Sequence, residues 1–203
     1  MGLYATRIVP RLLDLAMRQD ILLPYRRRAV AEASGAVLEI GVGSGLNLPL
    51  YGAAAASVCA VEPSPELLRM ARRRRETARP PVLLLRGRAE HLPCRDGAFA
   101  TIVSTWTLCS IADPLRALKE MRRVLAPGGR LVFVEHGLAP EARVARWQRR
   151  LTPLWQHLAG GCRLDRNIAA LIRAAGFAVG ALDTGYMKGP KVMTFLYQGW
   201  AEA

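Results

Sequence analysis

The chain has 203 residues, about the length of one domain, with 51% hydrophobic and 22% charged residues. This balance is typical of a soluble globular protein and excludes a disordered or low-complexity chain. A formal net charge of +13, from 29 basic and 16 acidic residues, raises the question of an anionic partner such as nucleic acid or lipid headgroups. We expect most of the arginines to lie on a solvated surface, because net charge gives information on non-specific binding and not on activity.

The cysteines and the N-terminus bear on compartment and metal binding. Cys59, Cys94, Cys109 and Cys162 are widely spaced, so no C-x-x-C pair and no zinc or haem signature can be built from them. We therefore expect reduced thiols and no metal. No secretory signal is visible, and no apolar run approaches the ~20 residues that cross a bilayer. These features predict a cytoplasmic protein, with peripheral contact to an anionic membrane surface as an alternative.

Residues 1–34 precede the first predicted strand, and their apolar residues recur at helical spacing. The segment is also basic, with arginines at 7, 11, 18 and 26–28. We expect one or two amphipathic helices that pack on the sheet as a cap. A helix lying on a membrane surface is the alternative, and one helix can do both.

Seven short apolar runs follow and predict seven β-strands, at residues 37–40, 57–61, 82–85, 101–105, 131–134, 177–182 and 192–197. Helical patterns lie between most of them. One helix should begin at Ser64-Pro65-Glu66, and another at Asp113-Pro114, ending at Ala126 before a proline and two glycines. Strands that alternate with helices predict a mostly parallel sheet.

The last two predicted strands are joined by a short segment that contains Gly185, Gly189 and Pro190. A parallel connection needs a dozen or more residues, so the last strand should be antiparallel to its neighbour. The prediction is an α/β fold with an open seven-stranded, mostly parallel sheet and helices on both faces.

A glycine-rich turn, Gly41-Val42-Gly43-Ser44-Gly45, follows the first predicted strand directly. Glycine has no Cβ and tolerates positive φ, so such a turn lets the backbone come close to a ligand. In an open parallel sheet, ligands bind at this end of the strands. The third glycine arrives one residue too early for a dinucleotide fingerprint, and the Lys and Ser or Thr of a phosphate loop are absent.

Two further elements each follow a predicted strand. Glu62 ends the second strand, where a carboxylate can accept hydrogen bonds from both hydroxyls of a ribose, which indicates a nucleoside and argues against a 2′-phosphate. Residues 87–93 follow the third strand and can line an adenine. Glu39, Glu62 and Glu90 supply acidic groups in a basic protein, which suits a cationic cofactor.

With these elements in this order, the chain resembles the class I methyltransferases that use S-adenosylmethionine (SAM). The shared motifs are E-x-G-x-G-x-G at 39–45, V-E-P at 61–63, G-x-A-E-x-L-P at 87–93 and L-x-P-G-G-R-L at 125–131. The resemblance implies one SAM-dependent methyltransferase domain over residues 1–203, with a helical cap at 1–34 and a Rossmann-like core at 35–203. It implies SAM as cofactor, S-adenosylhomocysteine as product, and a cofactor site formed by Glu39, Gly41, Gly43, Gly45, Asn47, Glu62, Pro63, Ala89, Glu90 and Thr105.

A narrower resemblance links residues 105–111, 135–137, 147, 153–155 and 161–166 to the membrane-associated thiol methyltransferases of the methyltransferase-like group and their bacterial relatives. It implies a small, apolar acceptor, with a thiol ahead of a phospholipid amine (phosphatidylethanolamine) or a quinone. A thiol reacts as thiolate, so His136 is the candidate general base, with a structural histidine as the alternative. Trp106, Cys109, Trp147 and Trp155 are candidates for the acceptor pocket, with a place in the core as the alternative.

Two other functions compete with this interpretation. The basic charge and the run Arg72 to Arg75 favour an RNA methyltransferase, but four consecutive helical residues point around most of a turn and form no flat binding face. No N-P-P-Y or D-P-P-Y element follows the fourth predicted strand either, so nucleic acid is not the expected partner. The second competitor is a non-catalytic SAM-binding protein, against which the glycine turn and Glu62 argue. The sequence does not predict an oligomeric state.

Overall fold

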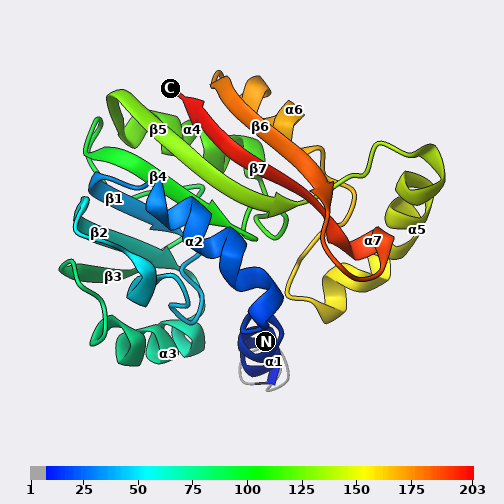
Figure 1. The fold of residues 1–203 in the computed structure, drawn as a ribbon, viewed down its shortest axis with the longest axis horizontal. Coiled ribbons are helices and arrows are strands. Elements are labelled where there is room, and N and C mark those ends of the chain that lie inside the picture. The colour runs from blue at the N-terminus through cyan, green and yellow to red at the C-terminus, as the bar shows by residue number, and fades with distance from the viewer. Residues whose placement is uncertain (1–7) are drawn as a thin grey trace.

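The computed structural model describes residues 8–203, so the first seven residues of the predicted cap, including Arg7, lie outside the described part. One open sheet of seven strands organises the chain, in the order β3-β2-β1-β4-β5-β7-β6 (Figure 1). Every neighbouring pair is parallel except the two pairs that β7 forms with β5 and β6. The predicted α/β class with an antiparallel last strand is confirmed.

The strands are β1 (Gly35–Ile40), β2 (Ala55–Glu62), β3 (Val82–Arg86), β4 (Phe99–Thr105), β5 (Leu125–His136), β6 (Ala178–Tyr186) and β7 (Phe195–Glu202). Each overlaps a predicted apolar run, but the last prediction is shifted. Its first residues form the short helix α7 (Lys191–Thr194), and β7 continues to Glu202 because it pairs with the long strand β5 as far as Arg130. Backbone pairing thus extends this strand through residues 198–202, where Gln198 and Gly199 interrupt the apolar run.

The helices are α1 (Val9–Met17), α2 (Leu23–Ala31), α3 (Pro65–Arg75), α4 (Pro114–Val124), α5 (Ala142–Leu158) and α6 (Ile168–Ala174), with two short 3₁₀ turns, η2 (Asp20–Leu22) and η3 (Leu48–Leu50). Ser64 and Asp113 cap α3 and α4 as predicted, each accepting a hydrogen bond from a backbone N–H three residues on. Helix α4 ends at Val124 rather than Ala126, because β5 begins at Leu125.

Helices cover both faces of the sheet, as predicted. In Figure 1, α2 crosses the front of the sheet, and α4 and α6 lie behind it. Helix α2 packs through Ala29 and Val30, and Ala29 is buried against Val132 and Val134 of β5. The predicted cap therefore packs on the sheet through its second helix.

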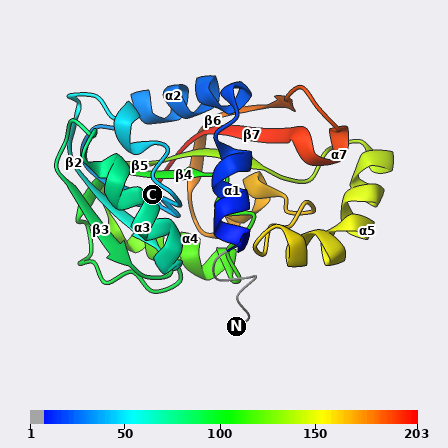
Figure 2. The ribbon, with the colours of Figure 1, turned by 90° about the horizontal axis from the view of Figure 1, so that it is seen from below.

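The first helix of the cap takes a different position. Seen from below, α1 passes between α3 on one side and α5 on the other (Figure 2). A Cβ built on Gly160, just beyond α5, would lie 3.1 Å from Leu13 Cδ1, so α1 is packed against the end of α5. Among the described residues, none of the helices combines the length and apolar character needed to cross a membrane.

Candidate cofactor and acceptor site

One cavity of about 620 Å³ lies at the carboxyl ends of β1, β2, β4 and β5, where open parallel sheets bind ligands, and residues of α1 cover it. It falls within the size range of small-molecule sites. Most of the sequence-predicted site residues line it: Gly41, Gly43, Glu62, Pro63, Ala89, Glu90, Thr105, Trp106, Cys109, His136 and Trp155. Glu39, Gly45, Asn47 and Trp147 do not.

The glycine turn has the backbone that its sequence indicates. Gly41, Gly43 and Gly45 all have positive φ, at 64°, 55° and 86°. A Cβ on Gly45 would lie 3.0 Å from the Cα of Ala71, so this glycine lets α3 pack tightly on the turn. The backbone of Gly41 and Gly43 meanwhile faces the cavity without a side chain. The turn therefore combines close helix packing with an exposed backbone at the cavity wall.

Glu62 is a buried carboxylate at the cavity wall. Its two oxygens accept backbone N–H bonds, one from Gly43 at 3.1 Å and one from Ser64 at 2.9 Å. Burial raises the pKa of Glu62, and these two hydrogen bonds partly offset the rise. Within residues 8–203, no basic nitrogen lies within salt-bridge distance of it. Each oxygen thus keeps a lone pair for an additional donor, such as a hydroxyl.

A polar network lies beneath the glycine turn. The carboxylate of Glu39 accepts hydrogen bonds from Asn47 Nδ2 at 2.9 Å and from the hydroxyl of Tyr51 at 3.0 Å, and Asn47 Nδ2 also donates to Thr105 Oγ1. Burial raises the pKa of Glu39 to about 7 against these donors. Glu39 and Asn47 therefore support the turn from below and do not face the cavity.

Arg26 connects the cap to this network, and sequence reasoning missed it. Its guanidinium donates to Asn47 Oδ1 at 2.9 Å and stacks 4.9 Å from the ring of Trp106, while the side chain lines the cavity. Burial lowers its pKa to about 10. Only Arg26 of the run 26–28 is buried. No local pattern separates the three arginines, so the signal comes only from the way α2 packs.

A second cap contact fixes α1 beside the glycine turn. Arg74 Nη1 donates to Asp14 Oδ1 at 3.0 Å and to the carbonyl of Ser44 at 2.6 Å, and Arg18 also pairs with Asp14. The other three arginines of the run 72–75 are exposed. One member of a run interpreted from sequence as solvated is therefore a structural link between α3, the turn and the cap.

Of residues 87–93, the first four border the cavity next to Glu62. Gly87, Arg88, Ala89 and Glu90 line it, and Arg88 Nη2 donates to Glu90 Oε1 at 3.2 Å. Burial raises the pKa of Glu90, but the Arg88 bond, backbone hydrogen bonds and the positive charge of Arg88 together hold it below its usual value. The Arg88 side chain is mostly exposed, so it forms the outer rim of the cavity.

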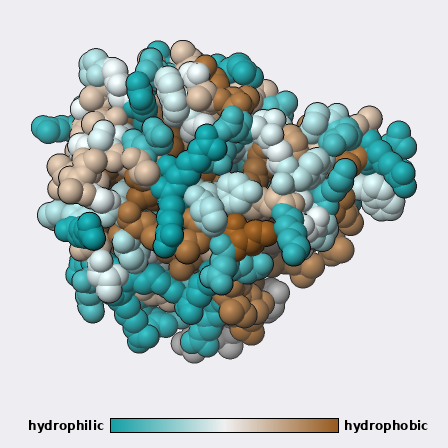
Figure 3. Space-filling view, viewed as in Figure 1, coloured by the Kyte–Doolittle hydropathy of each residue, from teal (hydrophilic) through white to brown (hydrophobic). Residues whose placement is uncertain are grey.

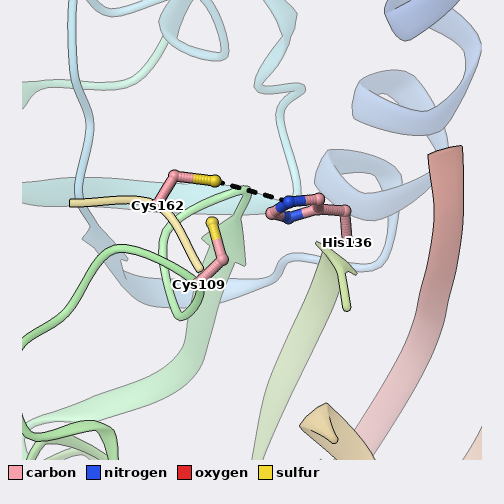
Figure 4. A group of neighbouring side chains, drawn as sticks. All are labelled: Cys109, His136 and Cys162. Atoms are coloured by element: carbon pink, nitrogen blue, oxygen red, sulfur yellow. Dashed lines mark hydrogen bonds between the residues drawn. The ribbon is translucent and has the colours of Figure 1, made fainter. Parts of the chain in front are cut away.

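The other end of the cavity holds a sulfur and imidazole cluster, which we call the Cys-His cluster: Cys109, His136 and Cys162 (Figure 4). Their ligand-type atoms all lie within 4.8 Å of one another, and His136 Nε2 is 3.4 Å from Cys162 Sγ. His136 is only 7% exposed, and its Nδ1 has no partner within the described residues. The spacing of the cysteines indicated no ligand set, yet the fold assembles one.

Backbone hydrogen bonds hold the three segments of this cluster together. The N–H of Arg163 donates to the carbonyl of Cys109 at 2.9 Å, and the N–H of Leu138 donates to the carbonyl of Arg166 at 2.8 Å. Cys162 also accepts from Trp155 Nε1 at 3.3 Å. A hydrogen bond from Cys109 lowers the pKa of the Cys162 thiol. The cluster is thus fixed by main-chain contacts between segments distant in sequence.

The predicted aromatic residues are not all brought together. Trp106, with an unusual positive φ of 50°, and Trp155 line the cavity, as do Met187 and Met193, and Trp155 contacts Cys162. Trp147 lies on α5 away from the cavity, 48% exposed, with Arg150 stacked on its ring. Trp147 therefore does not contribute to the pocket wall in this structure.

Comparison with known proteins gives a consistent family assignment. A family model described as a methyltransferase domain matches residues 38–133. The chain is 34% identical over 147 residues to human thiol S-methyltransferase TMT1B, covering 69% of this chain and 59% of the relative. It is 37% identical to a phosphatidylethanolamine N-methyltransferase of Cereibacter sphaeroides over 131 residues, 62% of this chain and 64% of that one. The chain thus spans about three fifths of the length of these relatives.

Solved structures match over nearly the whole chain. A SAM-dependent methyltransferase from Thermotoga maritima superimposes with a TM-score of 0.66 at 26% identity, covering 97% of this chain and 99% of that one. The relatives with different acceptors are similarly identical to this chain, at 34% and 37%. Overall identity therefore points to the methyl donor and leaves the acceptor to the residues of the site.

Proposed function

Because the chain belongs to the class I SAM-dependent methyltransferases, we propose that it transfers a methyl group from SAM to a small, apolar acceptor, with a thiol as the favoured acceptor. The observation that carries the proposal is the single cavity that joins the glycine turn and Glu62 to the Cys-His cluster. A cofactor held at one end and an acceptor at the other would lie within the same cavity, as an in-line displacement requires.

At the cofactor end, each proposed contact matches the chemistry of a group in SAM. Glu62 has free lone pairs for the ribose hydroxyls, and the bare backbone of the glycine turn suits the amino-acid part. Arg26 lines the same wall and offers a cation for the carboxylate. Pro63, Ala89 and Glu90 would border the adenine. When bound, SAM supplies an electrophilic methyl group on a sulfonium.

At the acceptor end, the residues hold the thiol and take its proton. The acceptor sulfur forms a bond to the methyl carbon as the carbon–sulfonium bond breaks, giving a methyl thioether and S-adenosylhomocysteine. The thiol proton must leave before or during this step. His136 lies at this wall with its Nε2 3.4 Å from Cys162 Sγ, which also lines the cavity, so we assign it the role of proton acceptor.

The lining of the acceptor end favours a thiol over the other acceptors. Trp106, Trp155, Met187 and Met193 contribute apolar groups to the cavity wall, and Trp155 contacts Cys162 of the cluster. Polarisable sulfur and aromatic groups suit an alkyl thiol. A phospholipid amine or a quinone ring is the alternative, and both are acceptors of enzymes that this chain resembles.

The decisive experiment follows labelled methyl from SAM into candidate acceptors. The purified chain is incubated separately with a small alkyl thiol, phosphatidylethanolamine vesicles, a demethylated quinone and RNA. We expect labelled methyl thioether as the main product. His136→Ala should lower kcat/KM by about 10²- to 10⁴-fold with SAM affinity kept, whereas the exposed His91→Ala should leave both unchanged. Label in RNA alone would refute the proposed acceptor class, and no label anywhere would favour a binding protein.

We also propose that the cap rests on an anionic membrane surface. Ile8, Leu12 and Leu15 recur at helical spacing on α1 and are 48%, 52% and 68% exposed, and Figure 3 shows apolar residues gathered at the lower edge of the molecule, over α1. Arg11 on this helix and Arg18 directly after it are also exposed. Apolar and basic residues together suit binding at a lipid interface.

Vesicle sedimentation tests this contact. The chain should bind vesicles with anionic lipid more tightly than neutral ones, and Leu12→Ser with Leu15→Ser should weaken that binding. Leu83→Ser, at an equally exposed leucine on β3, is the matched control. Equal binding by both variants would refute a role for α1.

A further inference from the structure

We infer that Cys109, His136 and Cys162 form a binding site for one Zn²⁺ ion whose fourth coordination position opens into the cavity. Two thiolates and one imidazole are a ligand set typical of catalytic zinc, where three protein ligands leave a position for water or substrate. The inference that this position binds the acceptor thiol rests on the proposed function. Binding of the ion itself does not.

The spacing of the three ligand atoms suits a zinc ion. Bond lengths of ~2.3 Å to sulfur and ~2.0 Å to nitrogen place two ligand atoms of a tetrahedron roughly 3.5 Å apart. His136 Nε2 and Cys162 Sγ are 3.4 Å apart, and all three ligand atoms lie within 4.8 Å of one another. Small side-chain movements are therefore enough to bring all three onto one ion.

The site is preorganised by its surroundings. The carbonyl of Cys109 is bonded to the N–H of Arg163, the residue after Cys162, which fixes the two cysteine segments side by side. The indole N–H of Trp155 donates to Cys162 Sγ, the kind of outer contact that orients a metal-bound thiolate. An ion would then bind ligands that are already close together, without the entropy cost of ordering a loop.

A second observation concerns the histidine of the cluster. His136 is a nearly buried side chain at the cavity wall whose Nδ1 has no partner within residues 8–203. Buried polar groups are rarely left unpaired. The other nitrogen of His136, Nε2, faces Cys162 Sγ at 3.4 Å and is the one that would bind the ion. All three ligands line the same cavity as Glu62 and the glycine turn.

A thiol at the open position would be ionised by the ion. The acceptor S–H bond breaks, the sulfur binds Zn²⁺ as thiolate, and the proton leaves to solvent. The sulfur then forms its bond to the methyl carbon as the carbon–sulfonium bond breaks, and the thioether, a poorer ligand, leaves. In this zinc form, His136 is a ligand and the ion replaces it as the group that ionises the acceptor.

Metal titration of the intact chain tests the site without an activity assay. The protein is stripped with a chelator and titrated with Co²⁺, a spectroscopic substitute for Zn²⁺. We expect one equivalent to bind, with thiolate-to-cobalt charge-transfer bands and tetrahedral d–d bands. Cys109→Ser and Cys162→Ser should each weaken binding by more than the ~10- to 100-fold typical of outer-shell changes. Cys59→Ser and Cys94→Ser, at the two cysteines outside the cavity, should not.

A protection experiment on the unmodified chain covers the case in which a variant fails to fold. Zn²⁺ should shield Cys109 and Cys162 from a thiol-alkylating reagent and leave Cys59 and Cys94 as reactive as before. No stoichiometric binding, or equal protection of all four cysteines, would overturn the site and leave His136 as proton acceptor.

A final arm separates the metal site from the proposed function. Adding a small alkyl thiol to the cobalt form should shift the charge-transfer bands. If cobalt binds but the thiol does not shift the charge-transfer bands, the metal site is supported and its role in binding the acceptor is overturned. If the thiol binds the metal and receives no methyl group, the proposed function fails and the metal site stands.

Discussion

The two ends of the cavity are built in different ways. The cofactor end is formed by short segments that each follow one strand directly, with the glycine turn after β1, Glu62 at the end of β2 and residues 87–90 after β3. The Cys-His cluster takes one residue from the turn after β4, one from the end of β5 and one from the loop between α5 and α6.

The two ends also differ in how their polar groups are satisfied. At the cofactor end, the carboxylates of Glu39 and Glu62 have hydrogen bonds on both oxygens. At the acceptor end, His136 Nδ1 and Glu135 Oε2 are buried with no partner in the described part of the chain. The chain itself therefore satisfies the carboxylates of the first end, whereas it leaves buried polar atoms unpaired at the second, which is uncommon in a protein interior.

The largest effect should come from breaking the cofactor end at Gly45. Gly45→Ala combines a φ of 86° with a Cβ 3.0 Å from the Cα of Ala71, a backbone atom that cannot rotate away. Strain and overpacking together should lower the free energy of unfolding by about 2 to 5 kcal/mol, measured by denaturant titration. Gly52→Ala, with nothing within 4 Å, is the control. Equal stability of the two variants would contradict the close packing of α3 on the turn.

Removing the proposed ribose acceptor should have the next effect. Glu62→Ala should weaken SAM binding by about 10- to 100-fold, because charge-assisted hydrogen bonds contribute roughly 1.5 to 3 kcal/mol. Calorimetric titration measures it, with the exposed Glu76→Ala as control. Co²⁺ binding at the Cys-His cluster should not change, which sharpens the contrast between the ends. Unchanged SAM affinity would remove the ribose assignment.

The buried network beneath the cofactor end should show in the pH dependence of stability. The pKa of Glu39 is raised to about 7 by burial, above its value of 4.5 when unfolded. The folded state therefore binds the extra proton, and this stabilisation is full below the unfolded pKa and lost as pH rises through about 7. The side chains that face the Glu39 carboxyl are those of Arg26, Asn47 and Tyr51.

Glu39→Gln removes this titration. From pH 5 to pH 8, the unfolding free energy of the unmodified chain should fall relative to that of the variant by on the order of 1 to 3 kcal/mol. Chemical denaturation at each pH measures the difference. Parallel profiles for the two proteins would show that Glu39 is ionised in both states.

The smallest effect compares neighbouring arginines of the cap. Arg26→Ala should weaken SAM binding by about tenfold, since it removes both a cation at the cavity wall and the hydrogen bond to Asn47. Arg27 is exposed, so Arg27→Ala should bind SAM normally. If both variants bind equally well, the cap contributes no charge to the cofactor end.

The sequence by itself determined which apolar runs form strands and that the last strand is antiparallel. It also determined that a glycine turn follows the first strand and that an acidic residue, Glu62, ends the second. These features are local, because the apolar pattern of a buried strand and the backbone freedom of a glycine depend only on residues close in sequence. Family membership rests on the same contiguous motifs.

Only the tertiary structure decided the rest. It separated Arg26 and Arg74 from their exposed neighbours, left Trp147 outside the cavity and extended β7 along β5. It also joined Cys109, His136 and Cys162 across segments up to 53 positions apart. Contacts of this kind depend on how helices and loops pack over the sheet, and spacing along the chain carries no record of that packing.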